Sequence, residues 1–334
     1  MDKVIDFEHK MAAHCETGTL TALLNYNGLN ITEPLVFGIA NGIFFGYLDS
    51  SNFPFPTIIV RSRPGQVREN ISKRLNVKLN KWRFKDPDKG ESKLDELISK
   101  GIPTAAQVDF FYMTYMPDWQ RVHINVHFIN IIGKKDDKYI ISDSYYPRKS
   151  ELNSDMMRKA RWAGGFMAPK GFMYYPDEIP ENIDFKKPVI KGIKRACRNM
   201  ISLPVPFVGV KGIYKFADKI KEWPSLVRDT DHLSHEIMKI NILLEDQGTG
   251  GAGFRFMYAT FLQQAAEILN NNNLLDLSKR MMENGDKWRE ISYFAAKIGK
   301  NRDLGNDRIE ELSLLIKKRA DEEKDFFKEL RKAV

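Results

Sequence analysis

The chain has 334 residues, of which 43% are hydrophobic and 29% are charged, with a formal net charge of +8. This balance is ordinary for a globular protein and excludes a mainly disordered chain. No apolar run reaches about 18 residues, so we expect neither a transmembrane helix nor membrane insertion. Residues 1–16 lack the apolar core of a secretory signal, and 2 cysteines are too few for a disulfide framework. We therefore expect a cytoplasmic protein.

The first 180 residues mix helix and strand signals. A helix is predicted over 16–27, because Leu20, Leu23 and Leu24 share one helical face and Gly28 is suited to a C-cap. Strand signals, rich in β-branched and aromatic residues, follow at 57–61, 107–113, 123–132 and 138–143. A short turn-rich connector joins the last two strands, so we expect them to form an antiparallel hairpin.

Residues 173–190 carry three prolines and several acidic residues, which predicts a linker. Almost everything after it has helical periodicity. The expected helices are 188–201, 210–223, 230–245, 253–270, 274–298 and 306–331. The sequence thus predicts an α+β domain with a mostly antiparallel sheet over 1–180, followed by an all-helical domain over 188–334.

Positive charge gathers in two tracts. Residues 61–85 contain nine basic residues and one acidic residue, and residues 186–221 contain ten basic residues and one acidic residue. Each tract is either a solvated helix face or a docking surface for an acidic partner. Neither zinc-finger spacing nor an RNA-binding aromatic motif is present, so we do not expect a nucleic-acid partner.

Cys15 lies at the start of the first predicted helix, in the sequence His14-Cys15-Glu16-Thr17. The first turn of a helix has unpaired backbone N–H groups and the positive end of the helix dipole. Both stabilise a thiolate, which is the nucleophilic form of cysteine. A buried structural cysteine is the alternative interpretation.

His127 lies in the predicted strand 123–132, and Asp143 ends the next strand. An imidazole can accept the thiol proton, and a carboxylate can fix its tautomer and stabilise the imidazolium. A Cys on an early helix, then His and Asp on neighbouring strands, is the chain order of papain-like cysteine enzymes. The alternatives are a structural sheet histidine with a turn-capping aspartate, or His123 as the base. His127 is preferred because it lies deeper in the apolar run.

A metal site formed by His123, His127 and Asp143 has no familiar ligand spacing, so no metal is expected. Two glycine-rich segments could contact an anion instead. The segment 33–47 could supply N–H groups to an oxyanion, with a tight packing corner as the alternative. The other segment, 247–253, precedes a helical pattern and could hold an anion at the helix N-terminus. It is not a Walker loop, and an ordinary helix–helix connection remains the alternative.

Together these motifs resemble the butirosin biosynthesis protein H family. The similarity to its N-terminal domain lies in His14-Cys15-Glu16, Glu33-Pro34, Phe37-Gly38, Gly42, the segment 108–112, the strand with His127-Phe128, and Asp143. The similarity to the helical domain that often follows lies in Gly248-Thr249-Gly250-Gly251, Phe254-Arg255, Tyr258 and Phe261-Leu262. The resemblance spans nearly the whole chain. It implies a papain-like domain, related to bacteriocin-processing cysteine peptidases.

The founding member of that family is an acyltransferase. It moves an aminoacyl group from the phosphopantetheine thioester of an acyl carrier protein to an amine. By position, the resemblance makes Cys15 the nucleophile, His127 the base and Asp143 the orienting carboxylate. Related peptidases use a Gln several residues before the Cys as oxyanion donor, but residues 8–13 contain none. The candidates here are the backbone N–H of Cys15, His14 and Asn41.

We therefore expect a cysteine acyltransferase of small-molecule biosynthesis, with an acyl carrier protein and a small-molecule acceptor as partners. No cofactor of its own is expected, because the phosphopantetheine arrives on the carrier. Further contacts are predicted at two places: the substrate at Gly248, Thr249 and Gly250, and the carrier at Arg68, Lys73 and Arg74. The alternatives are a thioesterase, amidase or peptidase with the same triad, or a catalytically silent binding protein. The acyl group, the acceptor and the oligomeric state are not decided, and a homodimer stays open.

Overall fold

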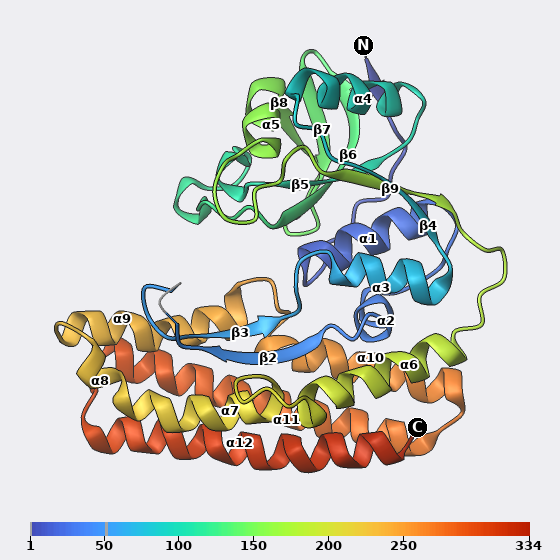
Figure 1. Cartoon of the computed structure of the whole chain (residues 1–334). Helices are drawn as coiled ribbons and strands as arrows, with labels where there is room; N and C mark the ends of the chain where they lie inside the picture. Colours follow the sequence, from blue (N-terminus) through green and yellow to red (C-terminus); the bar gives the residue numbers. More distant parts are fainter. Residues whose placement is uncertain (1, 51–52) are drawn as a thin grey trace. The chain divides into compact units, whose positions relative to one another are not determined.

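The computed structural model describes residues 2–50 and 53–334 (Figure 1). The chain forms two units, each built from two stretches of sequence. The first unit comprises Met1–Val36 and Pro64–Ile183, and the second comprises Phe37–Arg63 and Asp184–Val334. The sequence-based domains were continuous, so the structure differs from them in assigning residues 37–63 to the helical unit.

An antiparallel sheet forms the centre of the first unit. Its strand order is β4-β9-β5-β6-β7-β8, and β1 also pairs with β6. Every one of these pairings is antiparallel, and β6 and β7 form the predicted hairpin. The strands are β1 (Lys3–Val4), β4 (Lys78–Trp82), β5 (Thr104–Val108), β6 (His127–Lys135), β7 (Lys138–Ser142), β8 (Ser150–Asn153) and β9 (Met173–Glu178). The predicted antiparallel α+β fold is confirmed.

Helix α1 (Cys15–Tyr26) packs directly against this sheet. Leu20, Leu23 and Leu24 are fully buried, as their shared helical face predicted. The Thr19 hydroxyl donates to the carbonyl of Phe128 on β6 at 3.0 Å. In return, the Asn130 amide of the same strand donates to the carbonyl of Thr19 at 3.1 Å. These bonds fix the position of α1 along β6, and therefore the position of Cys15.

Gly18 allows the close packing of α1 near its first turn. A Cβ atom at this position would lie 2.4 Å from the Cβ of Ala12 and 2.8 Å from the Oγ of Ser144. Ser144 follows Asp143 directly, and its carbonyl accepts the N–H of Ala12 at 2.9 Å. The absence of a side chain at Gly18 thus keeps the start of α1 beside the end of β7.

The remaining helices of the first unit are α3 (Gln66–Leu75), α4 (Pro87–Ser99) and α5 (Ser154–Arg161), and α2 (Glu33–Ile39) leads into the second unit. The predicted strand 107–113 is wrong beyond Val108, because the Asp109 carboxylate accepts the N–H of Phe111 and caps a 3-10 turn, Phe110–Tyr112. Strand β6 begins at His127, four residues later than predicted.

The predicted linker 173–190 is wrong in its first part, because Met173–Glu178 form β9 between β4 and β5. Pro176 is tolerated because β5 pairs with β9 only at Met173 and Tyr174. On the other side, Pro176 lies opposite Leu79, next to a shift in the register of β4. Proline is therefore a poor marker of a linker where the pairing of a strand is incomplete.

The second unit contains the helices predicted after residue 188. They are α6 (Lys186–Cys197), α7 (Gly209–Lys219), α8 (Trp223–Leu226), α9 (Thr230–Asn241), α10 (Arg255–Leu269), α11 (Asn272–Lys300) and α12 (Asn306–Lys332). Its other component is a hairpin of β2 (Ile43–Leu48) and β3 (Thr57–Arg61). Phe45 stacks on Trp288 at 5.7 Å, and Tyr47 stacks on Phe216 at 5.7 Å. These aromatic contacts with α11 and α7 explain why the hairpin belongs to the helical unit.

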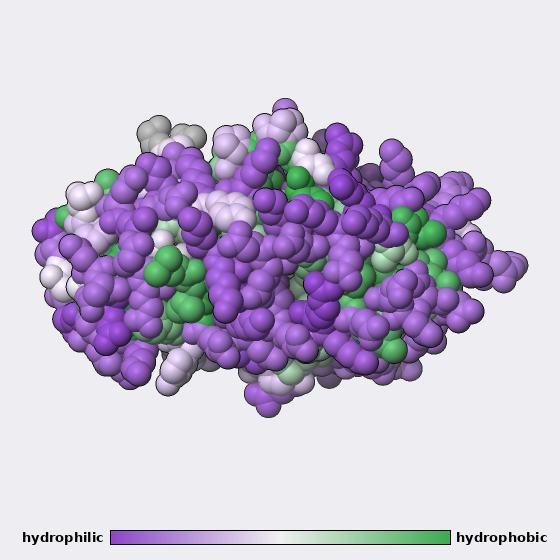
Figure 2. All heavy atoms as spheres, turned by 90° about the horizontal axis from the view of Figure 1, so that it is seen from below, coloured by the Kyte–Doolittle hydropathy of each residue, from purple (hydrophilic) through white to green (hydrophobic). Residues whose placement is uncertain are grey.

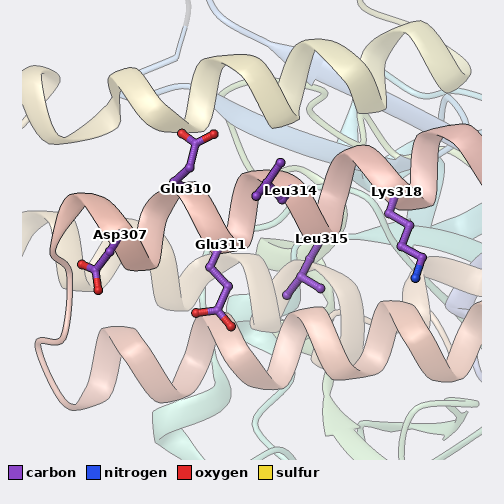
Figure 3. Close-up of a pocket in the computed structure, with 6 residues that line it drawn as sticks. All are labelled: Asp307, Glu310, Glu311, Leu314, Leu315 and Lys318. Carbon is purple, nitrogen blue, oxygen red and sulfur yellow. The ribbon is translucent and has the colours of Figure 1, made fainter.

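Most of the face seen in Figure 2 is hydrophilic, and its apolar side chains gather in separate patches. A shallow hollow lies along α12, lined by Asp307, Glu310, Glu311, Leu314, Leu315 and Lys318 (Figure 3). These residues include neither a nucleophile nor a histidine, so we assign no chemistry to the hollow. In the part of the chain that the structure describes, no helix is both long and apolar enough to cross a membrane.

Candidate active site

Cys15 is the first residue of α1 and is partly exposed. The carboxylate of Glu33 anchors the chain just before it. This carboxylate accepts the backbone N–H groups of Ala13 and His14, each at 2.9 Å, and the hydroxyl of Thr17 at 2.7 Å. Burial raises the pKa of Glu33. The N–H of Cys15 lies next in this series of helix-start donors and has no acceptor within the helix, so it is suited to bind an oxyanion.

His127 connects Cys15 to Asp143. The imidazole Nε2 lies 2.7 Å from Oδ2 of Asp143, and the Cys15 side chain also interacts with the ring. Because Nε2 is bonded to the carboxylate, Nδ1 is the ring nitrogen that remains for the thiol. The Sγ of Cys15 lies 3.9 Å from the carbonyl oxygen of Val126, the residue before His127. The structure thus brings together the three residues proposed from the sequence.

The electrostatics of this site favour an ion pair. Burial disfavours the charged imidazole, yet the carboxylate of Asp143 and its hydrogen bond raise the pKa of His127 to about 10, with a smaller contribution from Cys15. Burial also disfavours the charged carboxylate, but the neighbouring His127 and the hydrogen bonds it receives keep the pKa of Asp143 below its ordinary value. Both groups are therefore charged at neutral pH. An imidazolium beside a thiol stabilises the thiolate.

Two further groups hold the Asp143 carboxylate in place. The hydroxyl of Tyr115 donates to Oδ2 at 2.8 Å, and the backbone N–H of Tyr145 donates to Oδ1 at 2.9 Å. The ring of Phe110 contacts the His127 imidazole edge to face, with centroids 4.9 Å apart. Sequence reasoning missed Tyr115 and the role of Glu33, because a single residue far along the chain from its partner leaves no local pattern.

His123, the competing base, forms a separate pair. Its Nδ1 lies 2.7 Å from Oδ2 of Asp109, and its ring stacks on Phe111 with centroids 4.1 Å apart. The side chain of His123 is 63% exposed, whereas that of His127 is 9% exposed. Across residues 2–50 and 53–334, no cluster of three or more His, Cys, Asp or Glu side chains could hold a metal ion. Because His123 is exposed and paired with Asp109, His127 is the histidine that can act on Cys15.

Arg68 does not lie on an exposed docking surface, and this prediction is corrected. The residue is 7% exposed, and its guanidinium lies over the rings of Phe172 and Tyr174 at 4.4 and 5.0 Å. Its backbone N–H and that of Gly65 donate to the carboxylate of Glu16, which caps the start of α3. Arg68 is thus a buried packing residue, and its backbone is bonded to Glu16, the residue after Cys15. Lys73 is exposed and Arg74 is half-buried, so a docking role for these two residues stays a prediction.

Two of the proposed oxyanion donors already have other bonds. The backbone N–H of His14 donates to Glu33, and its Nδ1 lies 3.2 Å from the hydroxyl of Thr17. Asn41 is buried in the second unit, in a left-handed turn after α2 where its N–H donates to the carbonyl of Gly38. The backbone of His14 is therefore unsuited to the predicted role. A role for Asn41 stays a prediction.

The predicted anion site at Gly248, Thr249 and Gly250 is wrong, because the loop uses its own polar groups. Thr249 is fully buried, and its hydroxyl donates to the carbonyl of Leu244 and accepts the N–H of Gly251. The next N–H, that of Ala252, donates to the Glu245 carboxylate. An acidic side chain already occupies the position that an anion would need, so the loop is a structural connection.

A cysteine at the start of a helix, paired with a histidine and an aspartate on an antiparallel sheet, defines a papain-like cysteine enzyme. The comparisons with known proteins agree with this class. Residues 14–144 match the family described as butirosin biosynthesis protein H, N-terminal, and residues 155–330 match a domain of unknown function, DUF4872. The second match covers more than half of the chain, so the chain belongs to the DUF4872 family. The first match confirms the resemblance of residues 14–144 to the butirosin biosynthesis protein H family.

Among solved structures, the chain is similar to one described as a C39-like peptidase from Bacillus anthracis. The two share 14% sequence identity over 54% of this chain and 100% of that chain, with a TM-score of 0.38. No curated protein matches the chain in sequence.

Proposed function

We propose that the chain is a cysteine acyltransferase. It takes an acyl group from a thioester on an acyl carrier protein and passes it to an amine or hydroxyl of a small molecule. The observation that carries the proposal is the meeting of Cys15, His127 and Asp143, with the hydrogen bond between His127 and Asp143 and the raised pKa of His127. The match of residues 14–144 supports the same chemistry, because the matched family takes its name from a biosynthetic protein.

In the first half-reaction the Cys15 thiolate attacks the thioester carbonyl. The bond between the acyl carbon and the carrier's sulfur breaks, and the leaving thiolate takes the proton of the His127 imidazolium. The oxyanion formed on the way is stabilised by the N–H of Cys15 at the helix start. Because one thioester replaces another, the acyl-enzyme keeps the reactivity of the donor.

In the second half-reaction the acceptor attacks the acyl carbon of the acyl-enzyme. Neutral His127 now takes the acceptor's proton, and the Cys15 thiolate leaves, which restores the imidazolium–thiolate pair. Asp143 stabilises the imidazolium in both halves and holds the ring in the orientation in which Nδ1 faces the sulfur. Water in place of the acceptor would make the same site a hydrolase.

The donor's carrier is an acidic protein in this proposal, which suits the exposed basic residues of the tract 61–85. Lys73 and Lys81 are two of its exposed side chains. Each exposed ion pair contributes only about 0–1 kcal/mol, so docking depends on several pairs together and weakens with salt.

The test follows the fate of the acyl group. The enzyme is mixed with a carrier protein loaded with a short acyl group, in the presence and absence of a primary amine, and amide and free acid are quantified. We expect amide that requires Cys15 and increases with amine concentration. Free acid alone, at a rate that the amine does not change, would instead identify a hydrolase. A chain that never acquires the acyl group would be a binding protein.

A further inference from the structure

Three segments of the first unit carry exposed apolar side chains: the segment that leads into β6, the loop bonded to Asn125, and the residues after Asp143. We call them the apolar rim, and its members are Phe111, Trp119, Val122, Ile124, Tyr145, Phe166 and Met167. Trp119 and Phe166 are 81% and 84% exposed. Single exposed apolar residues are common, but exposed apolar residues on segments that are bonded to one another near a catalytic residue suit a binding surface.

The rim segment that carries Ile124 leads to Val126, whose carbonyl lies beside Cys15. Oδ1 of Asp109 accepts the N–H of Ile124 at 3.0 Å, and Oδ2 pairs with His123 at 2.7 Å. These bonds hold the segment that leads into β6. Two residues after Ile124, the carbonyl of Val126 lies 3.9 Å from the Cys15 sulfur. An acyl group on that sulfur therefore starts next to this segment.

The loop that carries Phe166 and Met167 is tied to the same segment. The Asn125 amide donates to the carbonyls of Gly164 and Phe166, at 2.8 and 3.0 Å. The amide of Gln107, a buried residue of β5, donates to the carbonyls of Asn125 and Met167, at 2.7 and 3.0 Å. Two amide side chains thus hold an exposed apolar loop in one position. A surface ordered before binding loses less entropy when a ligand arrives.

Tyr145 joins the rim from the other side of the histidine. Its ring contacts Phe110 at 6.0 Å, and the same Phe110 ring contacts His127 at 4.9 Å. Tyr145 also supplies the N–H that fixes Oδ1 of Asp143. The rim is therefore built on the same residues that position the base.

The charge of these loops indicates which ligand they suit. The acidic and basic side chains of residues 109–125 form two pairs, Asp109 with His123 and Asp118 with Arg121. Residues 164–167 are Gly-Gly-Phe-Met and carry no charge. In these two segments a ligand part with a free charge would find no free counter-charge and would lose hydration on an apolar surface.

We infer that the apolar rim binds the acyl group of the donor, and that this group is an uncharged aliphatic or aromatic chain of several carbons. The inference rests on the proposed function, since it names the substrate class of that site. The thioester carbonyl lies at Cys15, and the chain extends along the rim towards Phe166 and Trp119. Because the surface is open, it contributes part of the transfer free energy of each methylene group.

The test measures kcat/KM for acylation of Cys15 by thioesters of N-acetylcysteamine. The series runs from acetyl to octanoyl, with succinyl as a charged member. We expect kcat/KM to rise about two- to fourfold per methylene, as for a chain that is partly buried, and succinyl to react more slowly than its uncharged equivalent. In the double variant Trp119→Ala and Phe166→Ala, the ratio of octanoyl to acetyl falls about tenfold. The control is Val4→Ala, an exposed apolar residue on β1, which leaves the ratio unchanged.

The outcomes separate the two proposals. If acetyl and octanoyl donors acylate Cys15 equally, or succinyl is preferred, the inference about the rim is wrong and the acyltransferase proposal stands. If the double variant slows only donors presented on a carrier protein, the rim contacts the carrier and the inference is again wrong. If no thioester acylates Cys15 at all, the proposed function fails and the inference fails with it.

Discussion

The imidazole of His127 donates its Nε2–H to Oδ2 of Asp143 across 2.7 Å, and both side chains are almost completely buried. Neighbouring positions of the hairpin pair Asn130 with Ser142 and Ile131 with Ile141. His127 and Asp143 are therefore diagonal neighbours on one face, two positions away from a direct pair. The first half-reaction of the proposed mechanism depends on this contact, because it keeps the imidazole protonated beside the thiol.

Replacing the base should slow acylation without preventing it. His127→Ala removes the group that protonates the leaving thiolate, and we expect acylation by a small thioester to slow by about 10²–10⁴-fold, the usual contribution of a general acid or base. Stopped-flow measurement of the acyl-enzyme checks this. The control is His123→Ala, and an equal loss in both variants would show that His127 has no special role.

Removing the charge of the Asp143 carboxylate should change the pH dependence of Cys15 acylation. In the folded protein, burial lowers the pKa of His127, but the Asp143 carboxylate outweighs this effect and raises the pKa to about 10. The imidazolium should thus persist up to about pH 10, and Asp143→Asn should move the alkaline limb of the acylation profile to lower pH. An unchanged limb would show that Asp143 does not set the charge of His127.

The same pair links stability to pH. Because the pKa of His127 is raised in the folded state, its contribution is complete below the ordinary pKa of histidine, about 6.5. The contribution is lost as the pH rises towards 10. Urea unfolding of the wild type from pH 6 to 10 should therefore show a loss of stability that is smaller in Asp143→Asn. Parallel curves for the two proteins would contradict this linkage.

Tyr115 should act as a positioning residue. Tyr115→Phe removes the hydroxyl that donates to Oδ2 of Asp143, the oxygen that also accepts from His127. We expect acylation to slow about three- to tenfold, in line with one lost hydrogen bond of about 1 kcal/mol, together with a change in the pH profile. The matched control is Tyr112→Phe in the same segment. A purely structural role would lower stability and leave the pH profile of the remaining activity as in the wild type.

Gly18→Ala should destabilise the first unit. The new Cβ would lie 2.4 Å from that of Ala12 and 2.8 Å from Oγ of Ser144, and overpacking of this kind costs about 1–3 kcal/mol. The urea midpoint measures this loss. The control is Gly164→Ala, because a Cβ at Gly164 would meet no atom within 4 Å. If both variants unfold at the wild-type midpoint, the close contact of α1 with Ser144 does not stabilise the fold.

Carrier docking should depend on the exposed basic residues of the tract 61–85. Lys73→Glu with Lys81→Glu reverses two exposed charges, so we expect the KM for a carrier-bound donor to rise several-fold, and the effect to shrink at high salt. The KM for a small thioester should not rise. The control is Lys89→Glu, an exposed lysine on α4 outside the tract. Equal effects of both changes would assign the loss to net charge alone.

Local sequence patterns were sufficient to predict those parts of the site that depend on residues close together in the chain. The helical face of α1 and the hairpin of β6 and β7 follow from periodicity and turn signals, and they bring Cys15, His127 and Asp143 together. Contacts between distant residues leave no such pattern. Glu33 binds the start of α1, and Phe45 packs on Trp288 more than two hundred positions away. The anchoring of Cys15 and the membership of residues 37–63 in the helical unit therefore appear only in the structure.

The burial of charged residues was also beyond the sequence. Arg68 lies in a basic tract and is expected at the surface, yet two aromatic rings cover its guanidinium. Likewise, the glycine-rich loop before α10 looks like an anion site until its partners are known. Arg255 next to it forms a fully buried ion pair with Glu323, and the same carboxylate accepts from Trp288. That network holds α10, α11 and α12 together and leaves the loop a structural role.

The acylation of Cys15 is the central claim, and intact mass spectrometry tests it most directly. The protein is incubated with an acyl thioester without acceptor, and the modified peptide is identified after proteolysis. We predict a mass increase of one acyl group minus one hydrogen on Cys15, absent in Cys15→Ser and kept in Cys197→Ser. Cys197 is buried, and burial raises its pKa to about 12. An acyl group found on Cys197, or still present in Cys15→Ser, would contradict the account.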